Sequence, residues 1–290
     1  EIARWLQNVL VGIQYGALAV LVVVAFAAVA GVNRPDTAID VQASWFNPFE
    51  FFADGGGGFA ALTEGMLLMI FIYWGWDTIL ALNEETKGRD KTPGKAAVVA
   101  TLILLATYLL TSVAAVSYAG VGEEGIGLGN EENAGDVFRV IGEPILGSWD
   151  WLVLLAVLVS AAASTQTTIL PAARGTLAMG VYRALPKRFS SIHPRYRTPS
   201  FSTLVIGIVA STIFVLLSLL GENVYGDVLL ALGLQIAFYY GLTAIACVWY
   251  FRKDIAAGGS ALWMKGVLPL LGGLILIFAF IKSAIDMWAP

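Results

Sequence analysis

Long apolar runs separated by short polar segments make up most of this chain. Five stretches contain no Asp, Glu, Lys or Arg, namely residues 5–33, 96–122, 151–173, 198–221 and 228–251. Each is longer than the ~20 residues that a helix needs to cross the hydrocarbon core of a bilayer. Two further apolar runs carry some charge but are also long enough. The pattern therefore predicts seven spans, over about residues 5–30, 60–83, 96–119, 150–172, 201–220, 227–251 and 262–284.

The composition supports this interpretation, because 58% of the residues are hydrophobic and only 13% are charged. These values lie outside the range of soluble domains. We expect an all-α fold, a polytopic membrane helix bundle that forms a single membrane domain over residues 1–290. The composition excludes a soluble enzyme and a nucleic-acid partner, and it makes the lipid bilayer the main environment. The chain begins with Glu1 and runs directly into a span, so we expect it to be a piece of a longer polypeptide.

The loops indicate the orientation of the chain in the membrane. If the first span starts in the cytoplasm, thirteen of the 17 basic residues lie at inner ends and only Arg34 and Arg139 lie outside. The positive-inside rule then places the N-terminus inside and the C-terminus outside. The basic cluster from 183 to 197 is interpreted as a topology determinant beside anionic lipid. The segment 133–147 is predicted to form a short amphipathic helix over the outer face.

The second predicted span contains a feature that ordinary membrane helices lack. Gly75 lies near its middle, and Asp77 follows between aromatic residues. A carboxylate at the centre of a span costs roughly 2.5 to 3.5 kcal/mol on insertion scales, so it is expected to face a partner or water. Non-helical backbone is tolerated at membrane depth only where it lines protein or water. The sequence therefore predicts an unwound segment at residues 73–77; the alternative is a helix-packing glycine with a paired carboxylate.

Hydroxyl groups are concentrated in the fourth predicted span. At 100° per residue, positions 161, 164, 165 and 168 share one face, which offers a carbonyl and three hydroxyl oxygens. Such oxygens suit a small cation. The alternative is that these hydroxyls bond back to carbonyls of their own helix. The residues alone leave both interpretations open.

Two blocks of sequence resemble one transporter family. Phe71-Ile72-Tyr73-Trp74-Gly75-Trp76-Asp77, followed by Asn83-Glu84-Glu85-Thr86 and Pro93, is similar to the sixth helix and following loop of the amino acid–polyamine–organocation superfamily, the amino acid permeases. Residues 163–168, Arg174, residues 185–187 and residues 193–199 are similar to that family's eighth helix and the basic loop after it. The blocks occur in the family's order.

The resemblance implies a twelve-helix transporter with a five-plus-five inverted repeat, of which this chain corresponds to helices five to eleven, the N-terminal helices being missing. Phe71 would be an aromatic gate, and Ile72, Tyr73, Trp74, Gly75, Trp76 and Asp77 the unwound substrate-binding segment, with Thr168 in the pocket. Ala161, Ser164 and Thr165 match the sodium site of sodium-coupled relatives. Gln14 stands where some proton-coupled relatives have a lysine, which disfavours a lysine-based proton relay.

We therefore expect a secondary active permease, not an enzyme, that moves amino acids or related amines across the cytoplasmic membrane by alternating access. No organic cofactor is expected; Na⁺ is the candidate coupling ion, with exchange and uniport as alternatives. Other classes are a seven-helix receptor or photoreceptor, and a channel or structural subunit. A retinal pigment is disfavoured because Lys282 lies close to the outer end of the last span. The sequence does not identify the substrate.

Overall fold

The computed structural model describes residues 2–32, 34–47, 49–52, 57–75, 78, 86, 88, 91–133, 135–219 and 224–288. All regular secondary structure in these residues is helical. The long helices are α1 (Ile2–Ala27), α4 (Thr92–Ala119), α6 (Trp151–Val181), α7 (Ser200–Ser218), α8 (Val224–Tyr250) and α10 (Leu268–Trp288). The shorter helices are α2 (Gly58–Ile72), α5 (Val137–Leu146) and α9 (Arg252–Ala256). Short 3₁₀ or π turns flank several of them, and the all-α prediction is confirmed.

Six of the helical segments are long and apolar enough to cross a membrane, with lengths from 19 to 31 residues. They correspond to six of the seven predicted spans, and the chain is a multi-pass membrane protein. The second predicted span, 60–83, is represented by α2, whose 15 residues rise about 22 Å. This is shorter than the ~30 Å of the hydrocarbon core, so seven complete crossings are not established.

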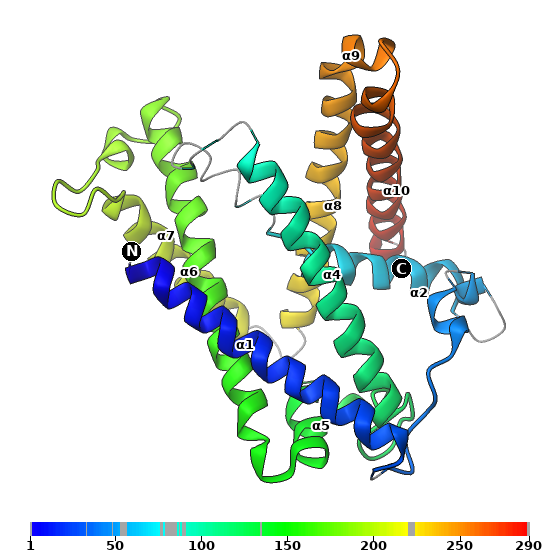
Figure 1. Cartoon of the computed structure of the whole chain (residues 1–290). Coiled ribbons are helices and arrows are strands. Elements are labelled where there is room, and N and C mark those ends of the chain that lie inside the picture. Colours follow the sequence, from blue (N-terminus) through cyan, green and yellow to red (C-terminus); the bar gives the residue numbers. More distant parts are fainter. Residues whose placement is uncertain are drawn as a thin grey trace. The chain divides into compact units, whose positions relative to one another are not determined.

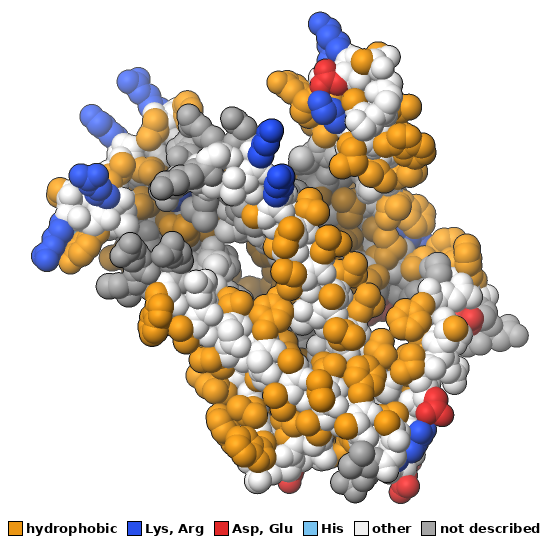
Figure 2. Space-filling view, viewed as in Figure 1, with side chains coloured by type: hydrophobic (Ala, Val, Ile, Leu, Met, Phe, Trp, Pro, Cys, Tyr) orange, Lys and Arg blue, Asp and Glu red, His pale blue; other side chains and the backbone are white. Residues whose placement is uncertain are grey.

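Exposed apolar side chains cover the long helices, as expected for surfaces that face lipid. In α7, only Ser202 is buried. In α4, the side chains of Val98, Val99 and Leu102 are each more than half exposed. Figure 2 shows hydrophobic side chains along α1 and α4, while the Lys and Arg side chains lie near helix ends and in loops. Hydrocarbon solvates these side chains, so their exposure carries no penalty in a bilayer.

The chain folds as two compact units, and the boundary between them falls within α7. The first unit, residues 1–43 and 76–208, contains α1, α4, α5 and α6. Within it α1 packs against α6 and α4, and α5 lies across one end of α1 (Figure 1). The buried cluster at that end contains Leu21, Tyr118, Ile141 and Val153. Ile141 belongs to α5, so the predicted amphipathic helix is present and its apolar face is anchored in this cluster.

The segment that leads from α4 to α5 is tightly folded. Leu128 N–H donates to the Gly120 carbonyl at 3.1 Å, and Gly129 N–H donates to the Gly122 carbonyl at 3.0 Å. A Cβ on Gly120 or Gly129 would lie within 2.7 Å of a backbone carbonyl oxygen. The Tyr118 hydroxyl also donates to the Pro144 carbonyl of α5 at 2.9 Å. These contacts fix the loop and α5 to the end of α4.

The second unit, residues 44–75 and 209–290, contains α2, α8 and α10. Helices α8 and α10 run side by side and are joined by α9 (Figure 1). Their backbones approach closely at two glycines, because a Cβ on Gly241 would lie 2.8 Å from Ile277 Cγ1 and a Cβ on Gly273 would lie 2.9 Å from the Ala244 Cβ. Small residues allow this approach between membrane helices. Lys282 forms an ion pair with Asp286 one turn further along α10.

Helix α6 is longer than the membrane span predicted within it. Helix α6 continues to Val181, nine residues beyond the predicted end at 172. The prediction stopped where Arg174 interrupts the apolar run, but a helix does not need an apolar sequence once it leaves the hydrocarbon. Pro171 lies inside α6 without ending it. Further along, the Thr176 hydroxyl donates to the Ala173 carbonyl at 3.0 Å and adds a hydrogen bond within the same helix.

Candidate functional site

Helix α2 ends within the segment that the sequence predicts to unwind. Its last residue is Ile72, and Tyr73 caps it with an N–H that donates to the Met69 carbonyl at 3.0 Å. Trp74 N–H then donates to the Phe71 carbonyl at 3.1 Å, which closes a turn. Gly75 follows with φ of 111°, a conformation that a residue with a Cβ adopts only with strain. Trp76 and Asp77, the remaining residues of the predicted segment, lie outside the described residues.

A tyrosine of α8 holds this turn in place. The Trp74 indole Nε1–H donates a 2.7 Å hydrogen bond to the hydroxyl of Tyr239. The Tyr239 ring packs edge to face against Tyr240, with ring centroids 4.5 Å apart. On the same two helices, a Cβ on Gly233 would lie 2.7 Å from the Leu67 carbonyl oxygen, so α2 and α8 are in close contact. Helix α8 therefore positions both the body of α2 and the turn after it.

Sequence reasoning missed Tyr239, although a signal was available. Adjacent tyrosines in the middle of a charge-free span are polar groups at membrane depth, and such groups usually have a partner. The sequence could not identify that partner, because Trp74 lies 165 positions away. Among the predicted substrate residues of α2, Phe71 is half-buried, while Ile72 and Trp74 are each 42% exposed.

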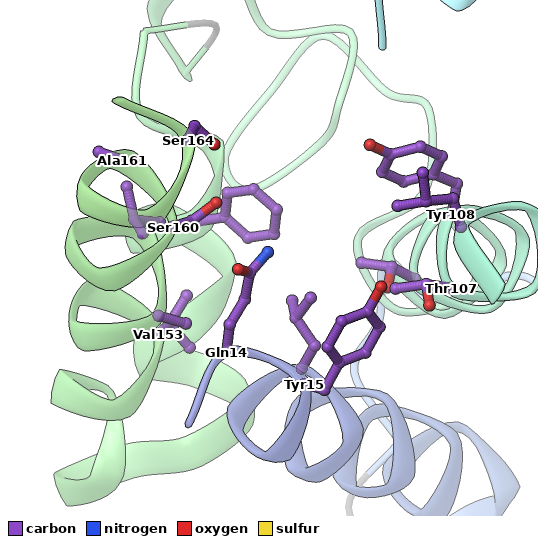
Figure 3. Close-up of a pocket in the computed structure, with 14 residues that line it drawn as sticks. Gln14, Tyr15, Thr107, Tyr108, Val153, Ser160, Ala161 and Ser164 are labelled. Carbon is purple, nitrogen blue, oxygen red and sulfur yellow. The ribbon is translucent and has the colours of Figure 1, made fainter. Parts of the chain in front are cut away.

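A cavity of about 450 Å³ lies within the first unit, between α1, α4 and α6. Three of the four residues predicted for the coupling-ion site, Gln14, Ala161 and Ser164, line it. Figure 3 shows Gln14 extending from α1 toward Ser160 of α6, while Thr107 and Tyr108 of α4 lie on the other side. Phe138 of α5 completes part of the wall. The fold thus brings Gln14 next to residues about 150 positions further along the chain.

The fourth predicted ion-site residue, Thr165, is not in the cavity wall. Its hydroxyl donates to the Ala161 carbonyl at 2.8 Å. The Thr168 hydroxyl donates to the Ser164 carbonyl at 2.8 Å, and the Thr167 hydroxyl donates to the Ser164 carbonyl at 3.0 Å. These threonines therefore fit the alternative interpretation, in which the hydroxyls donate hydrogen bonds to carbonyls of their own helix. Each oxygen keeps lone pairs that can accept a further contact.

The polar groups that face the cavity are neutral oxygen and nitrogen atoms. The fourteen lining residues include one carboxamide, Gln14, and six hydroxyls, those of Tyr15, Thr107, Tyr108, Thr111, Ser160 and Ser164, and none of them is charged. The described residues contain no group of three His, Cys, Asp or Glu that could hold a metal ion. The cavity can therefore offer neutral oxygen ligands to a cation or hydrogen bonds to an uncharged polar group. The tyrosines and threonines of α1 and α4 were not predicted to contribute.

The predicted site residues are divided between the two units. Phe71 to Gly75 belong to the second unit, while Gln14, Ala161, Ser164, Thr165 and Thr168 belong to the first. Within the first unit, Thr168 lies one turn beyond Ser164 on α6 and does not line the cavity. The structure thus gathers three ion-site residues around one cavity and shows the α2 turn as a separate feature.

Several apolar helices long enough to span a bilayer, one shorter helix that ends in a turn, and an uncharged cavity between helices of the first unit define a multi-pass membrane protein. The chain belongs to the amino acid permease family, whose sequence model matches residues 1–287. This membership confirms the family resemblance, and it places the chain among transporters and permeases, not among enzymes.

The chain is also similar to proteins described as uncharacterized transporters in Mycobacterium bovis and in two strains of Mycobacterium tuberculosis. Each is 27% identical over 215 residues, which make up 73% of this chain. The matched region spans 43% of the length of these relatives, less than half. No solved structure gives a significant match to the chain.

Proposed function

We propose that the protein is a secondary active transporter that carries amino acids or related amines across the cytoplasmic membrane by alternating access. The observation that carries this proposal is the end of α2 at Ile72, followed by a turn with Gly75 at φ of 111°. Family membership supports it. Discontinuous helices of inverted-repeat transporters expose backbone groups to substrate near the bilayer midplane, and the short α2 supports a seventh, interrupted span of that kind.

The substrate would be held by the segment Phe71 to Asp77. The Met69 and Phe71 carbonyls at the end of α2 each accept one N–H, and the second lone pair of each oxygen could accept the ammonium group of an amino acid or amine. Asp77 would supply a negative charge for the same ammonium group, and Phe71 would close over the substrate. Trp74 holds the turn in place through the hydrogen bond that its indole donates to the Tyr239 hydroxyl. Thr168 is proposed as a pocket residue contributed by α6.

The cavity in the first unit is proposed as the place of a coupling cation, with Na⁺ as the candidate. Gln14 and Ser164 present side-chain oxygens there, and the α6 backbone at Ala161 accepts the Thr165 hydroxyl. A cavity without acidic residues binds Na⁺ through neutral oxygens only, so binding would be weak and fully reversible. The Gln14 side chain cannot gain or lose a proton, so Na⁺ rather than a proton is the proposed coupling ion.

Counterflow in proteoliposomes tests the proposed function. Protein expressed from its natural coding sequence would be reconstituted into vesicles. The vesicles would be loaded with one unlabelled amino acid, and uptake of the same amino acid in labelled form would be followed. A carrier accumulates label transiently above the equilibrium level, because internal substrate speeds the return of the binding site. A panel of neutral, basic and acidic amino acids and amines would define the substrate. A channel gives no transient accumulation, and failure of the whole panel would reject the amino acid and amine assignment.

A further inference from the structure

The loop between α6 and α7 carries five basic residues and no acidic residue. Five basic residues, Arg183, Lys187, Arg188, Arg195 and Arg197, lie within 15 positions, and all five are exposed. The sequence contains no Asp or Glu between Asp150 and Glu222. Figure 2 shows blue side chains gathered over this loop. None of the five forms an ion pair with any residue that the structure describes.

The first half of the loop is folded back onto the end of α6. A Cβ on Gly180 would lie 2.7 to 2.9 Å from atoms of Phe189 and Ser190, so the 3₁₀ turn at Lys187–Ser190 packs directly against the helix backbone. The hydroxyl of the fully buried Ser202 donates to the Phe189 carbonyl at 3.0 Å. The Phe189 ring also packs edge to face on Phe201 at 5.1 Å. Lys187 and Arg188 therefore project from a fixed turn.

The second half of the loop is ordered around His193. The His193 backbone N–H donates to the Thr198 carbonyl at 2.8 Å, and the Arg197 N–H donates to the His193 carbonyl at 2.9 Å. The His193 Nδ1 accepts the N–H groups of Arg195 and Tyr196 at 3.2 and 3.3 Å. Arg195 lies over the Tyr196 ring, with Cζ 5.6 Å from its centroid. This network holds Arg195 and Arg197 in one compact turn.

The connection between two long apolar helices must lie at a membrane surface. Helices α6 and α7 are both among the six candidate spans, and the loop joins them directly. Its exposed aromatic side chains, Tyr182 at 83% and Tyr196 at 64% exposure, suit the headgroup region, where amphipathic rings concentrate. Guanidinium groups at that level, without an ion-pair partner among the described residues, match phosphate oxygens, with which arginine forms paired hydrogen bonds.

We propose that residues 182–198 form a folded binding surface for the headgroups of anionic phospholipids. Lys187 and Arg188 contact lipid phosphate from the 3₁₀ turn, and Arg195 and Arg197 do so from the turn around His193. The partner is bilayer lipid, because the loop is anchored at the membrane surface by the helices on both sides. The fold of the loop sets the spacing of the charges, so binding depends on that fold as well as on the number of charges.

A second basic turn in the chain provides a matched control. It contains Arg252, Lys253 and Lys265, but Lys265 is paired with Asp254 at 2.6 Å. Arg252 donates to the Trp249 carbonyl at 2.8 Å and lies over the Trp249 ring, so it is occupied within its own helix end. Two of the three basic residues of this turn, Arg252 and Lys265, have internal partners, and we therefore expect it to select anionic lipid much less.

Spin-labelled lipids test the proposal. The wild-type protein and the variants Lys187→Gln/Arg188→Gln, Arg195→Gln/Arg197→Gln and Arg252→Gln/Lys253→Gln would be reconstituted in phosphatidylcholine vesicles. The motionally restricted fraction of labelled phosphatidylglycerol would be compared with that of labelled phosphatidylcholine. We expect the wild type to select phosphatidylglycerol about fivefold. Each loop variant should lose most of this selectivity, while the Arg252→Gln/Lys253→Gln variant keeps it. Equal loss in all three variants, or no loss in the loop variants, overturns the proposal.

The contribution of the fold is tested without changing any charge. Gly180→Leu places a side chain where Phe189 packs, and Ser202→Ala removes the hydrogen bond to the Phe189 carbonyl. Both variants keep all five basic residues, and we expect both to reduce the selectivity for phosphatidylglycerol, with the larger effect from Gly180→Leu. If Gly180→Leu does not fold, Ser202→Ala still decides the question. Unchanged selectivity in a folded variant would show that charge alone acts.

Discussion

At the scale of single residues, the Trp74–Tyr239 hydrogen bond is the contact on which the geometry of the α2 turn depends most directly. Tyr239→Phe removes the acceptor and leaves the Trp74 N–H without its partner, which costs about 0.5 to 1.5 kcal/mol. If the turn binds substrate, we expect the uptake rate to fall roughly threefold to tenfold. Labelled amino acid uptake into proteoliposomes would measure this.

The control for that change is Tyr250→Phe at the other end of α8, where the tyrosine is 76% exposed. It alters the same residue type on the same helix without touching α2. Equal uptake by the Tyr239→Phe variant and the wild type would show that the Trp74 contact does not position the substrate site.

Ser164 is the residue whose role in ion coupling can be tested most cleanly. Its hydroxyl lines the cavity, whereas the neighbouring Thr167 hydroxyl is bonded to carbonyls of its own helix. If Na⁺ binds in the cavity as proposed, Ser164→Ala removes one of its oxygen ligands, and we expect the Na⁺ concentration for half-maximal uptake to rise roughly tenfold. Thr167→Val, which keeps the shape of the side chain, should leave it unchanged. Uptake that is independent of Na⁺ in the wild type would reject sodium coupling altogether.

At the scale of elements, a substitution at Gly75 tests whether the break after α2 is needed for uptake. Gly75 has φ of 111°, and an alanine there costs about 1 to 2 kcal/mol in a left-handed conformation. We expect Gly75→Ala to lower the uptake rate and the yield of folded protein. Gly65→Ala is the matched control, because Gly65 lies inside the same helix with no atom near its Cβ position. That change should be neutral or stabilising by about 0.5 to 1 kcal/mol.

The packing of α8 against α10 leads to a prediction about the stability of the protein. Gly273 is buried against Ala244, whereas its neighbour Gly272 is exposed and has open space at its Cβ position. Gly273→Val therefore overpacks the contact between the helices, which typically costs about 1 to 3 kcal/mol. We expect a lower midpoint of thermal unfolding in detergent for Gly273→Val and an unchanged midpoint for Gly272→Val. Equal midpoints would mean that the two helices do not pack at this point in the membrane.

At the scale of the whole molecule, the orientation predicted from the basic loops can be measured. In a Cys247→Ser background, Glu131→Cys and Lys187→Cys each introduce one exposed thiol, on opposite predicted sides of the membrane. A membrane-impermeant maleimide applied to intact cells should label Glu131→Cys only. The same reagent should label Lys187→Cys after the membrane is permeabilised. The reverse pattern would invert the topology.

The sequence was sufficient to predict most of the helices. Five charge-free runs and the apolar run at 262–284 correspond to six candidate spans, because a helix in hydrocarbon must satisfy its own backbone and show an apolar surface. Helix α2 ends at Ile72, three residues before Gly75 in the second predicted span. Helix α6 continues beyond the predicted span, since Arg174 limits the apolar run but not the helix. The substrate roles of Phe71 to Asp77 and Thr168 stay predictions.

The cavity and the Tyr239 contact could not be predicted in the same way. A membrane helix is apolar on every side, so its sequence does not show which face contacts a neighbouring helix and which faces lipid. Gln14 was placed beside Ser164 only through a family resemblance, and nothing in the sequence of α4 indicated that Thr107 and Tyr108 would face them. Such contacts depend on three-dimensional packing between helices far apart in the chain.

The glycine-rich segment between α4 and α5 has a practical consequence. Its own carbonyls occupy the space beside Gly129, the Thr37 carbonyl occupies the space beside Gly120, and α5 is hydrogen-bonded to the end of α4. An antibody fragment selected against the folded protein would therefore find there an epitope of constant shape, destroyed by denaturation. Such a fragment would give a label-free reporter of correct folding, and on intact cells it would show directly which way the protein faces.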